Sequence, residues 1–346
     1  MGRIAGVVCC ALVLAACGQG GQVTEPAAAP VRSVEPTASA SAQATLPSPE
    51  PVEPTTSPLS GRKGGIETPV MVIKLDNTRY AQPHRNLRAA DIVYVEPVEW
   101  GLTRLAAVYS TKIPEEVGPV RSARVSDIKL FAPYGPIAFV YSGAQTRLQP
   151  KLNAANWTAV SEDNDSAGFH RDYSRPGPYN LMAEPETILD AVGPVAVSQD
   201  MGLVFDDSPV AGGRRAKLAT ARWPESQMEF RWNKKAGVYD VWMNGYQARD
   251  TAGPGVQRAS TVVVQYVKEV ASRYGDKFGG VTPRSVTVGS GKGLVLRDGR
   301  AHPITWERAS AEDPTAYLDA DGEPMAFDPG QVWILLKDRT SKVKVE

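Results

Sequence analysis

Two arginines, Arg121 and Arg124, lie three residues apart in the segment VGPVRSARVSD, where an apolar strand pattern gives way to a helical one. Cations are unfavourable at the start of a helix because the backbone dipole is already positive there. If Ser122 or a neighbour caps this helix, its free amide groups could bind an anion, and each arginine contact to phosphate or carboxylate would add about 1.5–3 kcal/mol. The segment therefore predicts an anion site with Arg121 and Arg124 as its primary contacts.

Two polar residues, Asp76 and Asn77, follow an apolar segment at 70–75 that has the composition of a buried strand. The carboxyl end of a strand is where α/β folds often assemble a site. We expect Asp76 and Asn77 to orient a ligand or the arginines there. The alternative is a local role, in which both side chains cap the following turn.

A predicted hairpin farther along the chain carries Glu96, Glu99 and Arg104. In a regular hairpin Arg104 faces the same pair of strands as the two carboxylates. We expect Arg104 to add a third cation to the anion site and count Glu96 and Glu99 among the site residues. A structural ion pair explains the same residues equally well, and Arg121 could join it through Asp76 or Glu96 in a buried network.

The segment FHRDYSRPGPYNLM at 169–182 is polar and rich in turn formers, which is typical of a loop. It either closes over the arginines, with Asn180 as a further ligand-binding residue, or is a solvated connection. The three histidines, at 84, 170 and 302, lie far apart and lack the spacing of metal ligands. We therefore expect neither a metal ion nor a cofactor.

Motifs for catalysis are weak. Ser122 has neither a nucleophile elbow nor an evident histidine base. Asp76 with Glu96 or Glu99 could form an acid–base pair for glycoside hydrolysis, a mechanism decided by a separation that the sequence does not contain. The segment GSGKG at 289–293 lacks the residue order of a phosphate-binding loop, so we predict a β-turn there.

The residues that could do chemistry need a scaffold, and the chain changes its pattern near residue 200. From 65 to 199, helical patterns alternate with strand patterns, which predicts an N-terminal α/β-type domain with a mixed sheet. From 200 to 346, short strand patterns are separated by turn signals such as Asn244-Gly245 and Asp298-Gly299, which predicts a mostly antiparallel β domain with a frayed tail after Lys337. The expected fold class is α+β. The strand patterns of the first part lie at 70–75, 92–99, 102–110 and 136–142.

The N-terminal part of the chain has the composition of a targeting segment and a tether. Residues 1–16 have the basic start and short apolar run of a signal peptide, and Leu14-Ala15-Ala16-Cys17 resembles the lipobox of bacterial lipoproteins. We expect Cys17 to carry lipid, and acyl chains contribute about 0.8 kcal/mol per buried methylene to membrane anchoring. Residues 17–64, with few large apolar side chains, then predict a disordered tether on the outer face of the cell membrane.

Charge and cysteine content exclude some classes of partner. Lys and Arg together number 38, as do Asp and Glu, so we expect no nucleic-acid partner, and any preference for anions must be local. Cys9 and Cys10 would leave with the signal peptide, so the mature chain would contain no disulfide bond. The oligomeric state is not indicated.

Three segments resemble the YerB-like bacterial lipoproteins: KLDNTRYAQPHRNL, ADIVYVEPVEWGLTRLAAVY and, most specifically, VGPVRSAR. The resemblance covers nearly everything after the tether. It implies an envelope lipoprotein with a domain of unknown function in each of two parts, and it supplies no established reaction. Where the resemblance leads us to expect Pro-His-Asn-Leu, this chain has Pro178-Tyr179-Asn180-Leu181, which argues against a catalytic histidine there and leaves Asn180 as a binding residue.

The leading hypothesis is a non-enzymatic, membrane-anchored envelope protein that binds an anionic cell-wall polymer or a small anion through its arginines. One rival is an envelope hydrolase that uses Asp76 with Glu96 or Glu99. Another is a scaffold whose C-terminal β domain binds a protein. Guanidinium groups that converge in an open cleft would favour the leading hypothesis, and guanidinium groups neutralised by buried carboxylates would favour a structural network.

Overall fold

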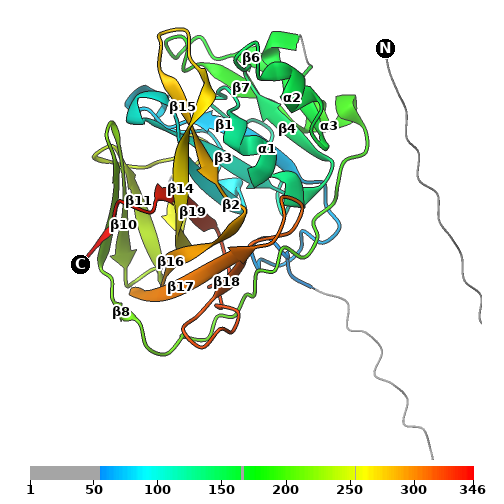
Figure 1. The fold of residues 1–346 in the computed structure, drawn as a ribbon. Coiled ribbons are helices and arrows are strands. Elements are labelled where there is room, and N and C mark those ends of the chain that lie inside the picture. The colour runs from blue at the N-terminus through cyan, green and yellow to red at the C-terminus, as the bar shows by residue number, and fades with distance from the viewer. Residues whose placement is uncertain (1–54, 165–166, 254) are drawn as a thin grey trace, which may run out of the picture. The chain divides into compact units, whose positions relative to one another are not determined.

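The computed structural model describes residues 55–346 except 165–166 and 254, and its main element is a mixed sheet of twelve strands (Figure 1). The first half of the chain contributes β1 (Met71–Asp76), β2 (Ile92–Pro97), β3 (Thr103–Tyr109), β4 (Ile137–Tyr141) and β5 (Trp157–Ser161). The second half contributes β8 (Arg214–Arg215), β14 (Thr261–Gly275), β15 (Val281–Val286), β16 (Gly289–Arg297), β17 (Arg300–Arg308), β18 (Ala316–Leu318) and β19 (Val332–Asp338).

The order of the strands joins the two halves of the chain in one sheet. From edge to edge it is β18-β17-β16-β14-β19-β2-β3-β1-β4-β5, and β15 and β8 pair with β14 and β17 outside this path. The two halves meet where β19 lies parallel to both β14 and β2. The domain boundary expected near residue 200 stays a prediction, but the hydrogen-bonded sheet itself is continuous across both parts.

A second, six-stranded antiparallel sheet and a few short helices complete the fold. The second sheet contains β9 (Leu218–Trp223), β10 (Ser226–Asn233), β11 (Val238–Met243), β12 (Tyr246–Gln247), β13 (Arg258–Ala259) and β20 (Lys344–Val345), and β6 (Phe169–Arg171) pairs with β7 (Leu181–Ala183) separately. The helices are α1 (Val125–Leu130), α2 (Gln149–Asn153) and α3 (Pro185–Val192), with 3-10 turns η1 (Arg79–Ala81), η2 (Leu87–Ala89), η3 (Glu99–Gly101), η4 (Ala132–Tyr134) and η5 (Glu162–Asn164). The predicted α+β class is confirmed, with a mixed sheet in the first half and mainly antiparallel pairing in the second.

The large sheet is buried on both faces at its central strands, which explains their continuous apolar runs. Met71 and Ile73 of β1 pack on one face against residues of the second sheet such as Phe230. Val72, between them, faces the opposite side and packs with Phe131, which follows α1. Successive side chains of a strand point to opposite faces, so each central strand contributes to both cores.

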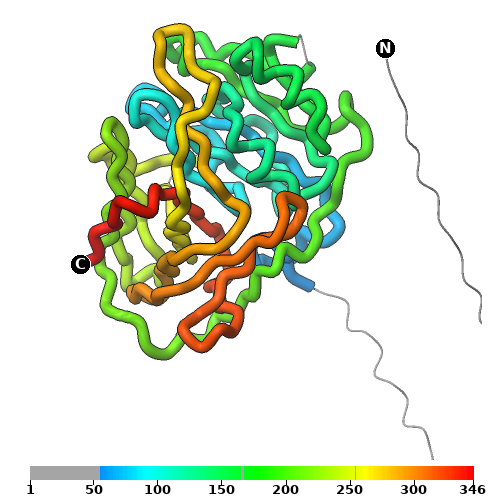
Figure 2. The backbone as a smooth tube through the Cα atoms, viewed as in Figure 1, coloured from blue at the N-terminus to red at the C-terminus, as the bar shows by residue number. Residues whose placement is uncertain are grey.

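Three local expectations are wrong, each because tertiary packing supplies partners that composition does not show. The chain after Lys337 does not fray, since β20 pairs with β9 and Val343 is buried; Figure 2 shows this C-terminal segment in red. The tether does not extend through residue 64, because Leu59 is fully buried. Residues 289–293 form the start of strand β16 rather than a β-turn.

Two predicted hairpin turns are confirmed and provide a matched test of packing. Gly245 and Gly299 both have positive φ, but an added Cβ at Gly299 would lie 2.8 Å from the indole nitrogen of Trp232, and at Gly245 it would contact nothing within 4 Å. We expect Gly299→Ala to lower the free energy of unfolding by about 1–2 kcal/mol more than Gly245→Ala, which has only the backbone strain. Urea unfolding of both variants measures the difference, and equal losses would contradict the role assigned to Trp232.

Candidate functional site

Three charged residues lie in a row across neighbouring strands of the large sheet. Asp76 on β1 is opposite Arg104 on β3, and Arg104 is opposite Glu96 on β2. Directly opposite residues in antiparallel strands share a face, so the three side chains are neighbours. All are buried, with exposed fractions of 0%, 7% and 1% respectively. The hairpin thus places Arg104 beside carboxyl groups, beneath the surface rather than on it.

The segment VGPVRSAR, residues 117–124 and called the arginine loop below, brings a second guanidinium group to Asp76. The backbone amide of Arg121 donates to the carbonyl oxygen of Lys74, which fixes the loop against β1. Nε of Arg121 lies 2.6 Å from Oδ2 of Asp76, and NH2 of Arg104 lies 3.6 Å from the same oxygen. Burial alone would raise the pKa of Asp76, but Arg104 and Arg121 lower it to about 2. The carboxylate of Asp76 therefore pairs with two cations.

Arg124 forms a separate ion pair. Its Nε and NH2 atoms donate to Oε2 of Glu99 at 2.9 and 2.7 Å, and its NH1 atom donates to the carbonyl oxygen of Ala123 at 3.0 Å. Glu99 lies in η3, the turn between β2 and β3, and also accepts the hydroxyl hydrogen of Thr282 on β15. The side chain of Arg124 is only 14% exposed. It is therefore held by the protein itself.

The start of helix α1 already carries a carboxylate. Arg124 rather than Ser122 is the N-cap residue, and Oδ2 of Asp127 accepts its backbone N–H at 2.6 Å. Oγ of Ser122 lies instead 3.3 Å from Oγ of Ser142. The backbone N–H of the N-cap residue is therefore already bonded to a carboxylate of the helix itself.

A second charge cluster is centred on Lys74, a residue outside the predicted site. Nζ of Lys74 donates to Oδ1 of Asp127 at 2.8 Å and also to a carboxylate oxygen of Glu96. Burial would lower the pKa of Lys74, but Asp127 and Glu96 raise it. Burial and the charge of Asp127 raise the pKa of Glu96 to about 8 despite the opposing lysine. The lysine within the apolar run VMVIKL was the available signal, because a strand covered on both faces leaves its ammonium group no route to solvent.

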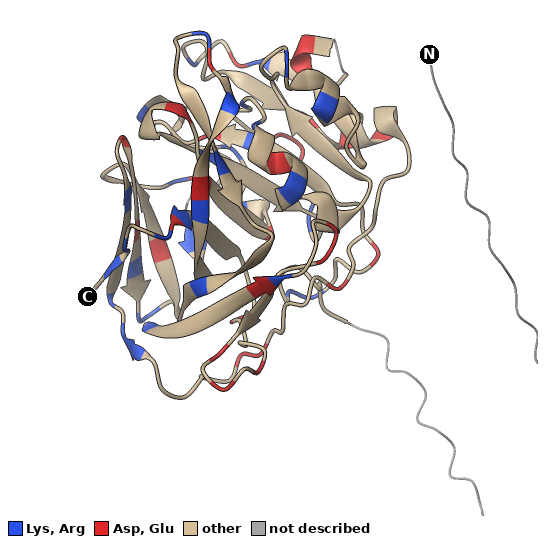
Figure 3. Ribbon diagram, in the orientation of Figure 1, with Lys and Arg blue, Asp and Glu red and all other residues tan. Residues whose placement is uncertain are grey.

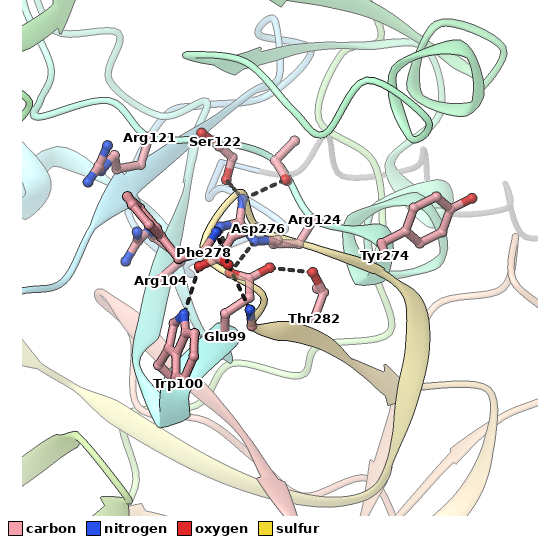
Figure 4. Close-up of polar contacts among 12 residues, drawn as sticks. Glu99, Trp100, Arg104, Arg121, Ser122, Arg124, Tyr274, Asp276, Phe278 and Thr282 are labelled. Carbon is pink, nitrogen blue, oxygen red and sulfur yellow. Dashed lines mark hydrogen bonds and ion pairs between the residues drawn. The ribbon is translucent and has the colours of Figure 1, made fainter.

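The guanidinium groups of Arg121 and Arg124 pair with different carboxylates, and Figure 4 shows Arg124 near Glu99 with Arg121 to one side. Arg124 lines a pocket of about 430 Å³ between the arginine loop and the β14–β15 hairpin, together with Tyr274. Arg121 lines a smaller pocket of about 160 Å³, together with Arg171. Ser122 lines both. The two arginines therefore do not meet in one cleft, because each is held by a different buried carboxylate, which is the arrangement expected of a structural network.

Comparison with known proteins identifies the family. Residues 56–197 match the N-terminal domain, and residues 219–334 the C-terminal domain, of the proteins of unknown function DUF3048. The chain belongs to the DUF3048 family. A Bacillus subtilis (strain 168) protein named "Putative lipoprotein YerB" is 26% identical over 293 residues, which cover 80% of this chain and 85% of that protein.

A solved structure shows the same fold. The crystal structure of the YerB protein from Bacillus subtilis matches with a TM-score of 0.70 at 22% identity, and the match covers 84% of this chain and 99% of that one. The resemblance to the YerB-like family that the motifs predicted is thus confirmed. The arginine loop lies within the segment that matches the DUF3048 N-terminal domain.

The loop that joins β6 to β7 in the DUF3048 N-terminal domain contacts Arg121. Cζ of Arg121 lies 5.5 Å from the ring centroid of Tyr179, the residue that stands where a histidine was expected, and Tyr179 in turn stacks on Tyr80. Asn180 is buried beside them, and its Oδ1 accepts NH1 of Arg171 at 3.1 Å. The loop therefore covers Arg121 with an aromatic ring, whereas Asn180 holds Arg171.

Asn77 has a structural environment. Its Nδ2 donates to Oγ1 of Thr103 at 2.7 Å, and its carbonyl oxygen accepts Nδ2 of Asn244 from the second sheet at 2.8 Å. Only 1% of Asn77 is exposed, so it links the DUF3048 N-terminal and C-terminal domains beneath the surface.

Across the described ranges, no three His, Cys, Asp or Glu side chains gather in a way that could hold a metal ion. In the same ranges no helix has the length and apolar character needed to span a bilayer.

Proposed function

We propose that this protein is an exported lipoprotein, anchored through Cys17 to the outer face of the bacterial cell membrane. The lipobox-like residues Leu14-Ala15-Ala16-Cys17 and the name of the Bacillus subtilis relative support this assignment. The signal peptide at 1–16, Cys17 and residues 18–54 of the expected tether lie outside the described residues. Mass spectrometry of the purified membrane form tests the proposal, and an unmodified Cys17 or an uncleaved signal peptide would contradict it.

Within that setting, the proposed activity is binding of an anionic ligand of the cell envelope at Arg121. The observation that carries it is the charge imbalance around Asp76, where one carboxylate faces two guanidinium groups. Arg104 is sealed, with a side chain 8% exposed, whereas 23% of the Arg121 side chain reaches solvent beside the 160 Å³ pocket. Arg121 is therefore the more accessible of the two cations, in a pocket that Arg171, Glu162 and Asp163 also line. A phosphate or carboxylate group there would gain a charge-assisted contact.

Replacement of Arg121 by glutamine tests this function without removing the partner of the buried Arg104. Poly(glycerol phosphate), a defined anionic polymer, is titrated calorimetrically into the mature chain carrying Cys17→Ser, which keeps every described residue and bears no lipid. We expect Arg121→Gln to weaken binding about tenfold or more, since a contact to a charged group contributes about 1.5–3 kcal/mol.

The matched control is Arg231→Gln, which removes an arginine from the exposed Arg231–Glu229 pair on β10. It should leave the affinity unchanged, and neutral dextran should not bind either protein. Unchanged affinity in Arg121→Gln, or an equal loss in Arg231→Gln, would remove Arg121 as the ligand contact.

The geometry gives the hydrolase hypothesis no support. Asp76 and Glu96 are sealed in the sheet and bonded to arginine and lysine side chains, so neither can reach a substrate without local unfolding. Glu99 lines the 430 Å³ pocket but already accepts hydrogen bonds from Arg124 and Thr282. The scaffold hypothesis for the C-terminal half stays a prediction.

A further inference from the structure

A groove in the C-terminal half is lined by cations without any carboxylate. It encloses about 630 Å³, and neither Asp nor Glu is among its lining residues. The groove's charged side chains are all exposed, and none forms an ion pair or a side-chain hydrogen bond with another described residue. We call this feature the basic groove, and its cations are Arg214, Lys268, Lys292, Arg339 and Lys342.

The basic groove opens where β14 changes its partner. Gln265 of β14 is opposite Gly293 of β16, but Lys268 is opposite Val286 of β15. The first residues of β16 therefore pair with β17 and not with β14, which leaves space between the two strands. The C-terminal tail after β19 contributes further lining residues, including Val343. The groove is thus a product of strand order rather than of a mobile loop.

The floor of the basic groove is apolar because its polar atoms are already used. The indole N–H of Trp306 donates to the carbonyl oxygen of Tyr266 at 3.0 Å, and the hydroxyl of Tyr266 accepts the backbone N–H of Val343 at 3.2 Å. Gly291 allows the indole to lie this close, since a Cβ there would be 2.7 Å from its nitrogen. Leu294 completes a surface that offers hydrocarbon and ring contacts to a ligand.

The positive charge of the basic groove is a local excess. The chain has equal numbers of cations and carboxylates, 38 of each, and these are interspersed over both sheets (Figure 3). Elsewhere exposed arginines such as Arg231 and Arg258 face carboxylate partners, whereas the cations of the groove face none among the described residues. Like charges around one hollow repel each other, and an anion between them relieves that repulsion.

We propose that the basic groove binds an amphiphilic phosphate, with the phosphate held by the exposed Lys and Arg side chains and the apolar chain laid on the floor. Its volume falls within the range of about 300–1,000 Å³ that is typical of small-molecule sites. Arginine adds bidentate geometry suited to phosphate oxygens, and Arg214 and Arg339 supply it here. The ligand class follows from the combination of a charged rim and an apolar floor. This site is separate from Arg121, which is not among its lining residues.

Three probes distinguish the contribution of the phosphate group to binding from that of the apolar chain. Octyl phosphate, inorganic phosphate and octyl glucoside, each below its micelle concentration, are titrated calorimetrically into the mature chain carrying Cys17→Ser, without detergent. Octyl phosphate should bind at least about tenfold more tightly than either of the others, because only it offers both charge and chain. Equal affinity for inorganic phosphate would mean a site for free phosphate, and equal affinity for octyl glucoside would mean a purely apolar one; either result overturns the proposal.

Variants place the ligand in the basic groove. Lys268→Glu with Lys292→Glu should weaken octyl phosphate binding about tenfold or more, whereas Lys234→Glu with Lys235→Glu, in the exposed turn between β10 and β11, should not. Val288→Ser, on the groove wall, should weaken octyl phosphate but not inorganic phosphate. Equal urea midpoints show that the variants fold. If the two double variants bind alike, the groove is not the site. Arg121→Gln should leave octyl phosphate binding intact, so this proposal and the proposed function can fail independently.

Discussion

Lys74→Met lowers the free energy of unfolding by about 3–5 kcal/mol, the expected result of removing one partner from a buried ion pair. Lys74 is fully buried and is the cation that contacts Asp127 and Glu96. Burial and the charge of Asp127 raise the pKa of Glu96, so uptake of a proton by Glu96 limits the loss. Methionine fills a similar volume, and the loss therefore reports charge rather than a cavity. Urea unfolding at pH 7 measures it.

Two further variants show whether the loss comes from the uncompensated carboxylate. Adding Asp127→Asn to Lys74→Met should recover roughly half of the free energy of unfolding that Lys74→Met loses. Asparagine can still accept the backbone N–H of Arg124 but carries no charge. Lys344→Met removes a lysine from the exposed pair with Glu346 and should cost less than about 1 kcal/mol. A Lys74→Met protein as stable as Lys344→Met would show that the buried cluster is not charged in the way we describe.

Asp76→Asn is expected to cost about 3–5 kcal/mol at pH 7, since it removes the carboxylate that contacts the buried guanidinium group of Arg104. Burial lowers the pKa of Arg104 to about 10, which keeps this group charged at neutral pH even when sealed from water. Arg121 can turn toward solvent in the variant, but Arg104 lies between two strands and cannot. Urea unfolding again measures the loss. Asp240→Asn, at the exposed pair with Arg258, is the control and should stay within about 1 kcal/mol of the parent.

The same carboxylate predicts a pH dependence with a definite sign. The pKa of Asp76 is about 2 in the folded protein and 3.8 as its ordinary value, so the unfolded chain binds the proton more readily. Its stabilisation is present above about pH 4 and is lost as the pH falls to about 2, with a total of about 2 kcal/mol. The parent protein should lose that much more stability than Asp76→Asn over this window. If the free energies of unfolding of the two proteins fall by the same amount between pH 4 and 2, the lowered pKa of Asp76 in the folded protein is contradicted.

Much of the fold could be predicted from residue patterns. The apolar run at 70–75 predicted a buried strand and the pattern at 92–99 a second strand, and the Asp298-Gly299 pair predicted a hairpin that the positive φ of both residues bears out. These signals are local, because strand burial and turn conformation depend on neighbouring residues. The order of strands could not be predicted in this way. The parallel pairing of β19 with β2 joins residues near 335 to residues near 95, and no local pattern encodes it.

The candidate site, too, could be predicted only in part from the sequence. The charged residues were visible in the sequence, and so was the alternative that Arg121 pairs with Asp76. Lys74 was missed because its partner Asp127 comes from a helix that follows much later in the chain. The cations of the basic groove were not grouped either, since they come from segments between residue 214 and residue 342. Which charges neutralise each other is a property of three-dimensional neighbours.

By itself, the sequence determined the family, the α+β class and the presence of guanidinium groups in the arginine loop. Only the tertiary structure decided that Arg104, Arg121 and Arg124 are each paired with a carboxylate, that Arg121 is the most exposed of the three, and that unpaired cations line a groove elsewhere. The physical reason is that the energy of a charge depends on its burial and on the nearest opposite charge. Both are set by which strands lie next to each other, and strands far apart in the chain are brought together only by the fold.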